Sequence, residues 1–185
     1  MVGPGFGTGK GARARLESLL DTLAKPVVAD ADVFHLLEPA ELAALVNCNA
    51  VLTPHPGELA DFLKTTTAAV QADRLGSARQ AAAATGHVVV LKGQGTIVAV
   101  PDGRAFLNPT GNPGMGTAGS GDVLSGMIGA LLAQGKSPEQ AAVAGVYIHG
   151  MAGDMARDLE TERSVTAMKI AAQIGPALGR LLGTT

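Results

Sequence analysis

Aromatic residues and cysteine are scarce in this sequence of 185 residues. Aromatics make up 3%, with no Trp and one Tyr, so the core has to be built mainly from Ala, Val, Leu and Ile. The single cysteine, Cys48, cannot form a disulfide within the chain, and a cysteine-rich zinc site is excluded. Such low cysteine usage is typical of a cytosolic protein, and we expect Cys48 to be a small, partly buried residue.

Excess charge of either sign and long apolar runs are also lacking. Fourteen Lys+Arg against 16 Asp+Glu give a net charge of −2, and the basic residues do not cluster, so we expect no nucleic-acid surface. The chain does not begin with a signal pattern, and Gly, Asp or His interrupts every apolar stretch before it could cross a membrane. The 46% of hydrophobic residues suit one soluble, cytoplasmic domain over residues 1–185.

Short apolar runs alternate with helical patterns along the chain. The run HVVVLKG at 87–93 is the clearest strand, because it is continuous and rich in β-branched residues. Further strands are expected at 26–30 and 50–53, and Asp102-Gly103 predicts a hairpin between the runs at 96–100 and 105–108. The expected helices cover 12–25, 38–46, 57–63 and 73–85, with three more after a glycine-rich segment. This alternation predicts an α/β fold with a mostly parallel sheet covered by helices on both faces.

The glycine-rich segment NPTGNPGMGTAGSGDVLSGMIGALL occupies residues 108–132. Gly114, Gly116 and Gly119 in it spell G-x-G-x-x-G, the pattern of dinucleotide-binding folds. That fingerprint requires a strand directly before its first glycine. The preceding NPTGNP does not make a central strand, because it contains Pro and Gly. We therefore reject the dinucleotide fingerprint on its context.

The second half of this segment predicts a helix that begins near Gly119. Free backbone N–H groups and the positive end of the helix dipole suit such a start to binding an anion. Asp122 in the first turn has two explanations: a residue favoured by the dipole, or a base that takes a proton from an attacking hydroxyl. The spacing leaves both open. The expected buried face consists of Val123, Met127, Ile128, Leu131 and Leu132.

Polar side chains follow three of the predicted strands. They are Asp30 with Asp32, His55 with Glu58, and Lys92 with Thr96. Since open α/β sheets bind ligands at the carboxyl ends of their strands, these residues predict a site there. His55 has a plain alternative as a turn residue between two prolines. The other histidines, His35, His87 and His149, match no site motif, and we expect them to be structural.

Four strings, in this order, resemble the ADP/ATP-dependent NAD(P)H-hydrate dehydratases of the ribokinase-like superfamily. They are GPGFG at 3–7, TPHPGE at 53–58, VVVLKGQGT at 88–96 and NPTGNPGMGTAGSGD at 108–122. The resemblance implies a ribokinase-like fold and repair of the S-form of hydrated NADH or NADPH. ADP or ATP, with Mg²⁺, would phosphorylate the C6 hydroxyl of the hydrated ring, and loss of phosphate would restore the cofactor. It also implies a homo-oligomer.

The same resemblance assigns roles to individual residues. Asp122 would be the catalytic aspartate and would contact the hydrated ring together with Gly5 and His55. Glu58 matches an acid that helps to organise Mg²⁺ indirectly. The implied nucleotide-binding residues are Lys92, Gly93, Gln94, Gly95, Thr96 and Gly121. The implied anion hole consists of Gly119, Ser120 and Gly121.

The resemblance has departures and competitors. Met115-Gly116-Thr117-Ala118 replaces a more usual Leu-Ala-Thr-Gly, which adds loop flexibility. The family fold normally begins with further strands and helices before GPGFG, so we expect N-terminal elements to be missing from this sequence. One competing function is a kinase of the same superfamily that acts on a vitamin precursor or sugar alcohol. Another is a nucleotide-binding module without catalysis.

Overall fold

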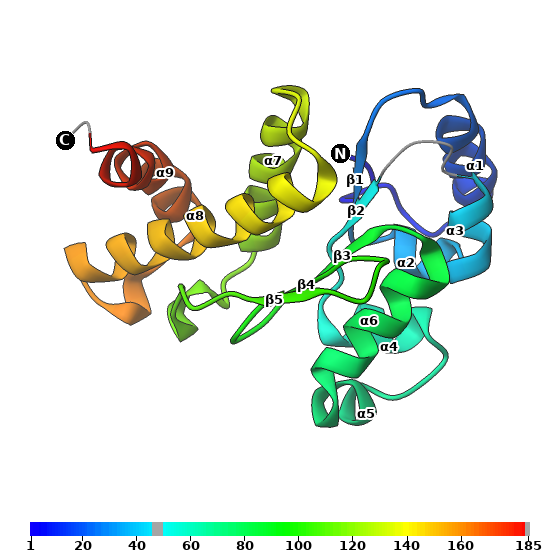
Figure 1. Ribbon diagram of the computed structural model, residues 1–185, viewed down its shortest axis with the longest axis horizontal. Coiled ribbons are helices and arrows are strands. Elements are labelled where there is room, and N and C mark those ends of the chain that lie inside the picture. Colours follow the sequence, from blue (N-terminus) through cyan, green and yellow to red (C-terminus); the bar gives the residue numbers. More distant parts are fainter. Residues whose placement is uncertain (46–49, 184–185) are drawn as a thin grey trace.

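A central sheet separates two groups of helices in the computed structural model of this chain (Figure 1). The structure describes residues 1–45 and 50–183, so Cys48 lies outside the described residues. Helices α1 to α6 lie on one side of the sheet, and α7 to α9 lie on the other (Figure 1). The predicted α/β fold with helices on both faces is therefore confirmed.

The sheet has five strands in the order β1-β2-β3-β4-β5. Their bounds are β1 Val27–Ala29, β2 Ala50–Leu52, β3 Val88–Leu91, β4 Ile97–Ala99 and β5 Ala105–Leu107. Strands β1, β2 and β3 are parallel, whereas β4 is antiparallel to both β3 and β5. Four of the five strands thus run in one direction, as expected of a mostly parallel sheet. The antiparallel pair β4–β5 is the hairpin predicted from Asp102-Gly103, where Gly103 takes a φ of 92°.

The helices confirm most of the predicted segments. Their bounds are α1 Ala12–Thr22, α2 Val33–Leu36, α3 Pro39–Leu45, α4 Pro56–Phe62, α5 Thr67–Ala72, α6 Arg74–Thr85, α7 Ser120–Ala133, α8 Pro138–Leu159 and α9 Ala167–Leu182. Short 3₁₀ helices lie at η1 Pro113–Met115 and η2 Glu162–Ser164. We did not predict α2 and α5, which are too short to show a repeating apolar pattern. In the described part of the chain, no helix has both the length and the apolar character of a membrane span.

Alternate strand residues divide the core into two layers. Ala29, Leu52 and Leu91 belong to a buried cluster with α1 to α6, whereas Val28 and Val90 belong to a second cluster with α7 and α8. Strand residues point to opposite faces in turn, so a strand buried on both faces has to be apolar throughout. This explains why the strand signal in the sequence is a continuous run and not an alternation.

Helix α7 corrects one prediction. Its side toward the sheet carries Leu124, Ile128 and Leu132, while Val123 and Met127 are only partly buried and pack against the cluster of α8 and α9. The predicted buried face omitted Leu124. It also combined the surface toward the sheet and the surface toward the cluster of α8 and α9 into one. Because α7 has neighbours on two sides, its buried arc is wider than the single stripe expected of a surface helix.

Candidate active site

The carboxyl ends of β1, β2 and β3 meet in one charged cluster. The ammonium Nζ of Lys92, after β3, lies 2.8 Å from Oδ1 of Asp30, after β1, and 3.7 Å from Oε2 of Glu58. Ser125 Oγ on α7 donates to Oδ2 of Asp30 at 2.7 Å. Asp30 is only 2% exposed, and these contacts satisfy both of its oxygens. The expected nucleotide-binding lysine is thus held in a fixed position by a buried ion pair.

His55 and Glu58 form the start of α4. His55 Nδ1 accepts hydrogen bonds from the backbone N–H groups of Gly57 at 3.0 Å and Glu58 at 3.1 Å. The Glu58 carboxylate accepts from the backbone N–H of His55 at 2.6 Å, which completes a capping box. The plain explanation of His55 as a local structural residue therefore agrees with its contacts. His55 is also one of the residues that line the cavity described below.

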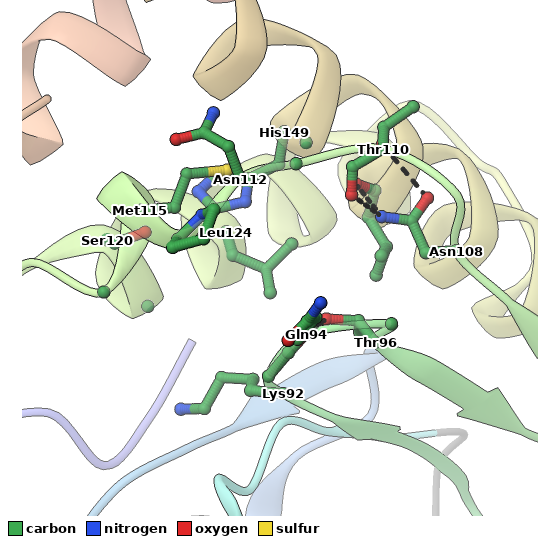
Figure 2. A pocket seen from close by; sticks show the side chains of 18 of the residues that line it. Lys92, Gln94, Thr96, Asn108, Thr110, Asn112, Met115, Ser120, Leu124 and His149 are labelled. Atoms are coloured by element: carbon green, nitrogen blue, oxygen red, sulfur yellow. Dashed lines mark hydrogen bonds between the residues drawn. The ribbon is translucent and has the colours of Figure 1, made fainter. Parts of the chain in front are cut away.

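A cavity of about 540 Å³ opens beside this cluster. Figure 2 shows Lys92, Gln94 and Thr96 on one side of it, and Asn112, Ser120 and His149 on the opposite side. Of the residues predicted for the site, those that line the cavity are His55, Lys92, Gly93, Gln94, Gly95, Thr96, Ser120 and Gly121. Gly5, Glu58, Gly119 and Asp122 are not among its lining residues. The structure therefore brings the turn at 92–96 and the start of α7 together at one cavity.

The turn at 92–96 is supported from behind by Arg74. One guanidinium nitrogen of Arg74 donates to the backbone carbonyls of Leu91 at 3.3 Å and Lys92 at 3.4 Å. Burial lowers the pKa of Arg74. Gly93 takes a φ of 135°, which a residue with a side chain rarely adopts. The turn can therefore present its backbone to the cavity.

The start of α7 is open to a ligand. Gly119 takes a φ of 84° at the N-cap, and no side chain caps the helix. A Cβ atom on Gly121 would lie 3.4 Å from Nζ of Lys92, so the ammonium lies close against this end of the helix. Free N–H groups, the helix dipole and a cation at one point favour an anion there.

Asp122 follows directly in the first turn of α7. Its side chain is exposed, and it has no hydrogen bond or ion pair among the residues that the structure describes. The carboxylates of Asp30 and Glu58, by contrast, are engaged by Lys92. Asp122 is thus the carboxylate at this helix start that is free to interact with a ligand.

The loop at 3–7 lies at the end of β1. Val2 pairs with Ala29 in parallel register, and the backbone N–H of Gly7 donates to Oδ2 of Asp32 at 2.8 Å. A Cβ atom on Gly3 would lie 1.7 Å from the carbonyl oxygen of Asp30, so only glycine fits at this crossing. Gly5 is exposed at the tip of the loop. The loop therefore belongs to the same end of the sheet as the cavity.

His149 on α8 corrects another expectation. It is 7% exposed, lines the cavity and makes a hydrogen bond to the backbone of Ser120, while its Nε2 has no hydrogen-bond partner among the described residues. Burial lowers its pKa to about 4, so the ring is neutral near pH 7. We expected a purely structural histidine, because its sequence context shows no neighbouring site motif. The cavity also contains Asn108, Thr110 and Asn112, whose roles the sequence did not indicate.

The site offers few ligands for a metal. In residues 1–45 and 50–183, no group of three or more His, Cys, Asp or Glu side chains could hold a metal ion. Mg²⁺ in phosphate-transfer sites keeps several waters and takes its remaining ligands from phosphates and one or two carboxylates. The side chains here fit a magnesium ion that is carried by phosphates and not by a protein cage.

Comparison with known proteins gives concordant matches. The model of the family described as NAD(P)H-hydrate dehydratase matches residues 1–176. Over 181 residues the chain is 46% identical to the ADP-dependent (S)-NAD(P)H-hydrate dehydratase of Neisseria meningitidis serogroup B. This alignment covers 96% of this chain and 60% of the Neisseria protein.

Solved structures agree with the sequence match. The ADP/ATP-dependent NAD(P)H-hydrate dehydratase of Bacillus subtilis, co-crystallised with ATP and Mg²⁺, superposes with a TM-score of 0.87 at 30% identity, over 97% of this chain and 63% of that one. Ribokinase of Thermotoga maritima superposes with a TM-score of 0.51 at 18% identity, over 88% and 59%, and shows that the fold is ribokinase-like. The chain thus spans about 60% of the length of the Neisseria relative.

Proposed function

This chain belongs to the NAD(P)H-hydrate dehydratase family, and from that premise we propose that it repairs the S-form of hydrated NADH or NADPH at the expense of ADP or ATP. One observation carries the proposal. The Lys92 ammonium lies against the uncapped start of α7, and the next residue after Gly121 is the unpaired Asp122. An anion site and a free carboxylate are therefore adjacent, as phosphoryl transfer to a hydroxyl requires.

Asp122 is the base in this proposal. Its carboxylate takes the proton of the C6 hydroxyl while that oxygen attacks the terminal phosphorus of the nucleotide. The bond from this phosphorus to the rest of the nucleotide breaks, and AMP leaves when ADP is the donor, or ADP when ATP is the donor. Phosphate then departs from C6 with the electrons of the C–O bond, and a proton passes from the neighbouring carbon to solvent to restore the double bond. Gly5 and His55 position the hydrated ring.

The start of α7 stabilises the phosphoryl group in transfer. Gly119, Ser120 and Gly121 form the proposed anion hole around its oxygens, in which the backbone N–H of Ser120 also donates to the carbonyl oxygen of Thr117 at 3.2 Å. Lys92 supplies positive charge from the side of the sheet. Preorganised donors of this kind need no rearrangement during the reaction, and the ion pair with Asp30 keeps Lys92 in place. The residues after Lys92, namely Gly93, Gln94, Gly95 and Thr96, bind the nucleotide along the other side of the cavity.

Magnesium accompanies the nucleotide in this proposal. When bound with the nucleotide, Mg²⁺ would supply positive charge to the phosphates, and Glu58 would help to organise it indirectly. We also propose a cytoplasmic location and a homo-oligomer. The exposed apolar side chains of Met168, Leu181 and Leu182 on α9 support the assembly.

The direct test is recovery of reduced nicotinamide. The protein is incubated with NADH hydrate, Mg²⁺ and either ADP or ATP, and absorbance in the band of the reduced ring is followed. We expect recovery that depends on the nucleotide, with free phosphate released. A folded sample that binds nucleotide without recovery would favour a binding module. A stable phosphorylated product would identify a kinase instead.

A further inference from the structure

The loop at 108–117 forms one wall of the cavity. Eight of its ten residues line the space, among them Thr110, Gly111, Asn112 and Met115. Apart from the single turn of η1, the loop has no regular structure of its own. The width of the cavity on this side therefore depends on what holds the loop in place.

The loop packs against helix α8 at two glycines. A Cβ atom on Gly150 would lie 2.2 Å from Oγ1 of Thr110, and one on Gly153 would lie 2.2 Å from Sδ of Met115. Glycine inside a helix costs about 1 kcal/mol relative to alanine, so its presence here needs a reason. The close approach of the loop supplies that reason at both positions.

Hydrogen bonds fasten the loop at the same place. Asp154 on α8 uses both carboxylate oxygens: Oδ2 accepts from the backbone N–H of Gly111 at 2.8 Å, and Oδ1 accepts from Nδ2 of Asn112 at 3.0 Å. Thr110 Oγ1 donates to the carbonyl oxygen of Tyr147 at 3.0 Å. Figure 2 shows Thr110 and Asn108 joined by hydrogen bonds in this part of the wall. Asp154 itself does not line the cavity.

The same stretch of α8 also reaches the other end of the glycine-rich segment. His149 makes its hydrogen bond to the backbone of Ser120, where α7 begins. The sequence HGMAGD at 149–154 thus contacts both the loop at 110–115 and the start of the proposed anion hole. Helix α8 therefore sets the distance between this loop and the start of α7.

We infer that Asp154 is a positioning residue that fixes the loop wall at Gly111 and Asn112 and thereby sets the affinity for the nucleotide. The inference rests on the proposed function for the identity of the ligand as ADP or ATP. Two donors from the loop, and the Arg157 guanidinium at 3.3 Å, meet the two carboxylate oxygens of Asp154, so a carboxylate fits this position. An amide at position 154 has only one acceptor oxygen, and its NH₂ group would face one of the donors that the carboxylate now accepts from.

The test compares Asp154→Asn with Asp158→Asn. Asp158 lies one turn further along α8 and pairs with Arg157, which also reaches Oδ1 of Asp154 at 3.3 Å. Its variant removes one negative charge from the same helix and leaves both contacts of Asp154 with the loop in place. We expect Asp154→Asn to raise the Kd for ADP roughly tenfold in a calorimetric titration, since charge-assisted hydrogen bonds are lost. The KM for NADH hydrate should stay close to that of the unchanged protein, and the melting temperature should fall by only a few degrees, for the hydrogen bonds lost. Asp158→Asn should bind ADP normally.

A swap of the two partners tests the contact itself. In Asn112→Asp with Asp154→Asn, the new amide at 154 can donate to position 112 and still accept from Gly111. The carboxylate at 112 can accept from the N–H of Gly114, as Oδ1 of Asn112 does now at 3.1 Å. Amide hydrogen exchange of residues 108–117 without nucleotide should therefore be faster in Asp154→Asn and slow again in the double variant.

The outcomes separate this inference from the proposed function. If the unchanged protein binds ADP but shows no turnover, while Asp154→Asn weakens binding, the inference stands and the dehydratase function fails. If turnover is present and the ADP affinity of Asp154→Asn lies within twofold of the unchanged protein, the inference is overturned. Equal losses for ADP and NADH hydrate would overturn it too, because they would indicate general damage.

Discussion

The two sides of the cavity handle charge differently. On the side of the strand ends, Lys92 is paired with Asp30 and Glu58, and the side chain of Lys92 is only 18% exposed. On the side of α7 and α8, the polar groups include backbone N–H groups, the Ser120 hydroxyl and the neutral His149. The exposed Asp122 in the first turn of α7 has no partner among the described residues. The paired charges of Lys92, Asp30 and Glu58 thus stabilise the fold, whereas the unpaired charge of Asp122 is free to interact with a ligand.

This difference has a physical basis. A buried ion pair strongly destabilises the fold when one partner is removed, because the other charge is left without compensation. An exposed carboxylate can change its protonation during a reaction at little cost to the fold. We therefore expect substitutions on the strand-end side to affect stability, and substitutions at the start of α7 to affect turnover.

The largest expected effect is on turnover in Asp122→Asn. A general base contributes about 10²- to 10⁴-fold to a rate, so turnover should fall roughly a thousandfold. Binding of ADP and the melting temperature should change little, because Asp122 has no partner to lose in the described structure. Kinetic assays measure turnover, titration calorimetry measures ADP binding, and thermal unfolding gives the melting temperature. Near-normal turnover would remove Asp122 from the role of base.

The next effect is on stability in Lys92→Met. The variant leaves Asp30, which is 2% exposed, without its cation, and we expect a loss of about 3 kcal/mol in the free energy of unfolding. Adding Asp30→Asn should recover part of this loss, because the uncompensated charge is removed. Urea unfolding of both single variants and the double variant measures the coupling. Purely additive losses would contradict a structural ion pair.

A pH-dependent effect is expected at His149. Its pKa in the folded protein is about 4, below the ordinary value of 6.5, because burial disfavours the charged ring. The unfolded chain therefore binds the proton first, and stability is lost as the pH falls from about 6.5 toward 4. The His149→Gln variant should lose less stability over this range. Urea titrations at pH 7, 6 and 5 test this, and parallel curves for the two proteins would refute it.

The smallest effect is expected far from the cavity. Ser137 caps α8 through the backbone N–H of Gln140 at 3.2 Å, and Gln140 completes the capping box at 3.1 Å. Ser137→Ala should lower the free energy of unfolding by about 1 kcal/mol. Turnover should not change, and a loss of turnover would show that the two ends of α8 are coupled.

Local patterns in the sequence predicted the elements of this fold well. The run at 87–93 and the hairpin at Asp102-Gly103 were both predicted correctly, because each depends on residues that are close along the chain. The start of α7 after Gly119 was predicted for the same reason. The short helices α2 and α5 were not, since one or two turns show no period.

Contacts between distant residues were beyond such patterns. Lys92 and Asp30 are 62 positions apart, and Gly111 and Asp154 are 43 apart. The sequence predicted that Lys92 lies at a strand end and Asp122 at a helix start. It also contains the strings on which the family resemblance rests. It did not indicate that Lys92 is already paired, or that His149 lines the cavity.

The sequence by itself determined which segments become strands, helices and turns, because backbone conformation and the alternation of apolar residues act over a few neighbouring positions. Only the tertiary structure decided which charges are paired and which remain free. Side-chain partners are set by how the parallel strands align and how α7 and α8 pack on them. That packing pairs Lys92, after β3, with Asp30, and it leaves Asp122, in the first turn of α7, without a partner among the described residues.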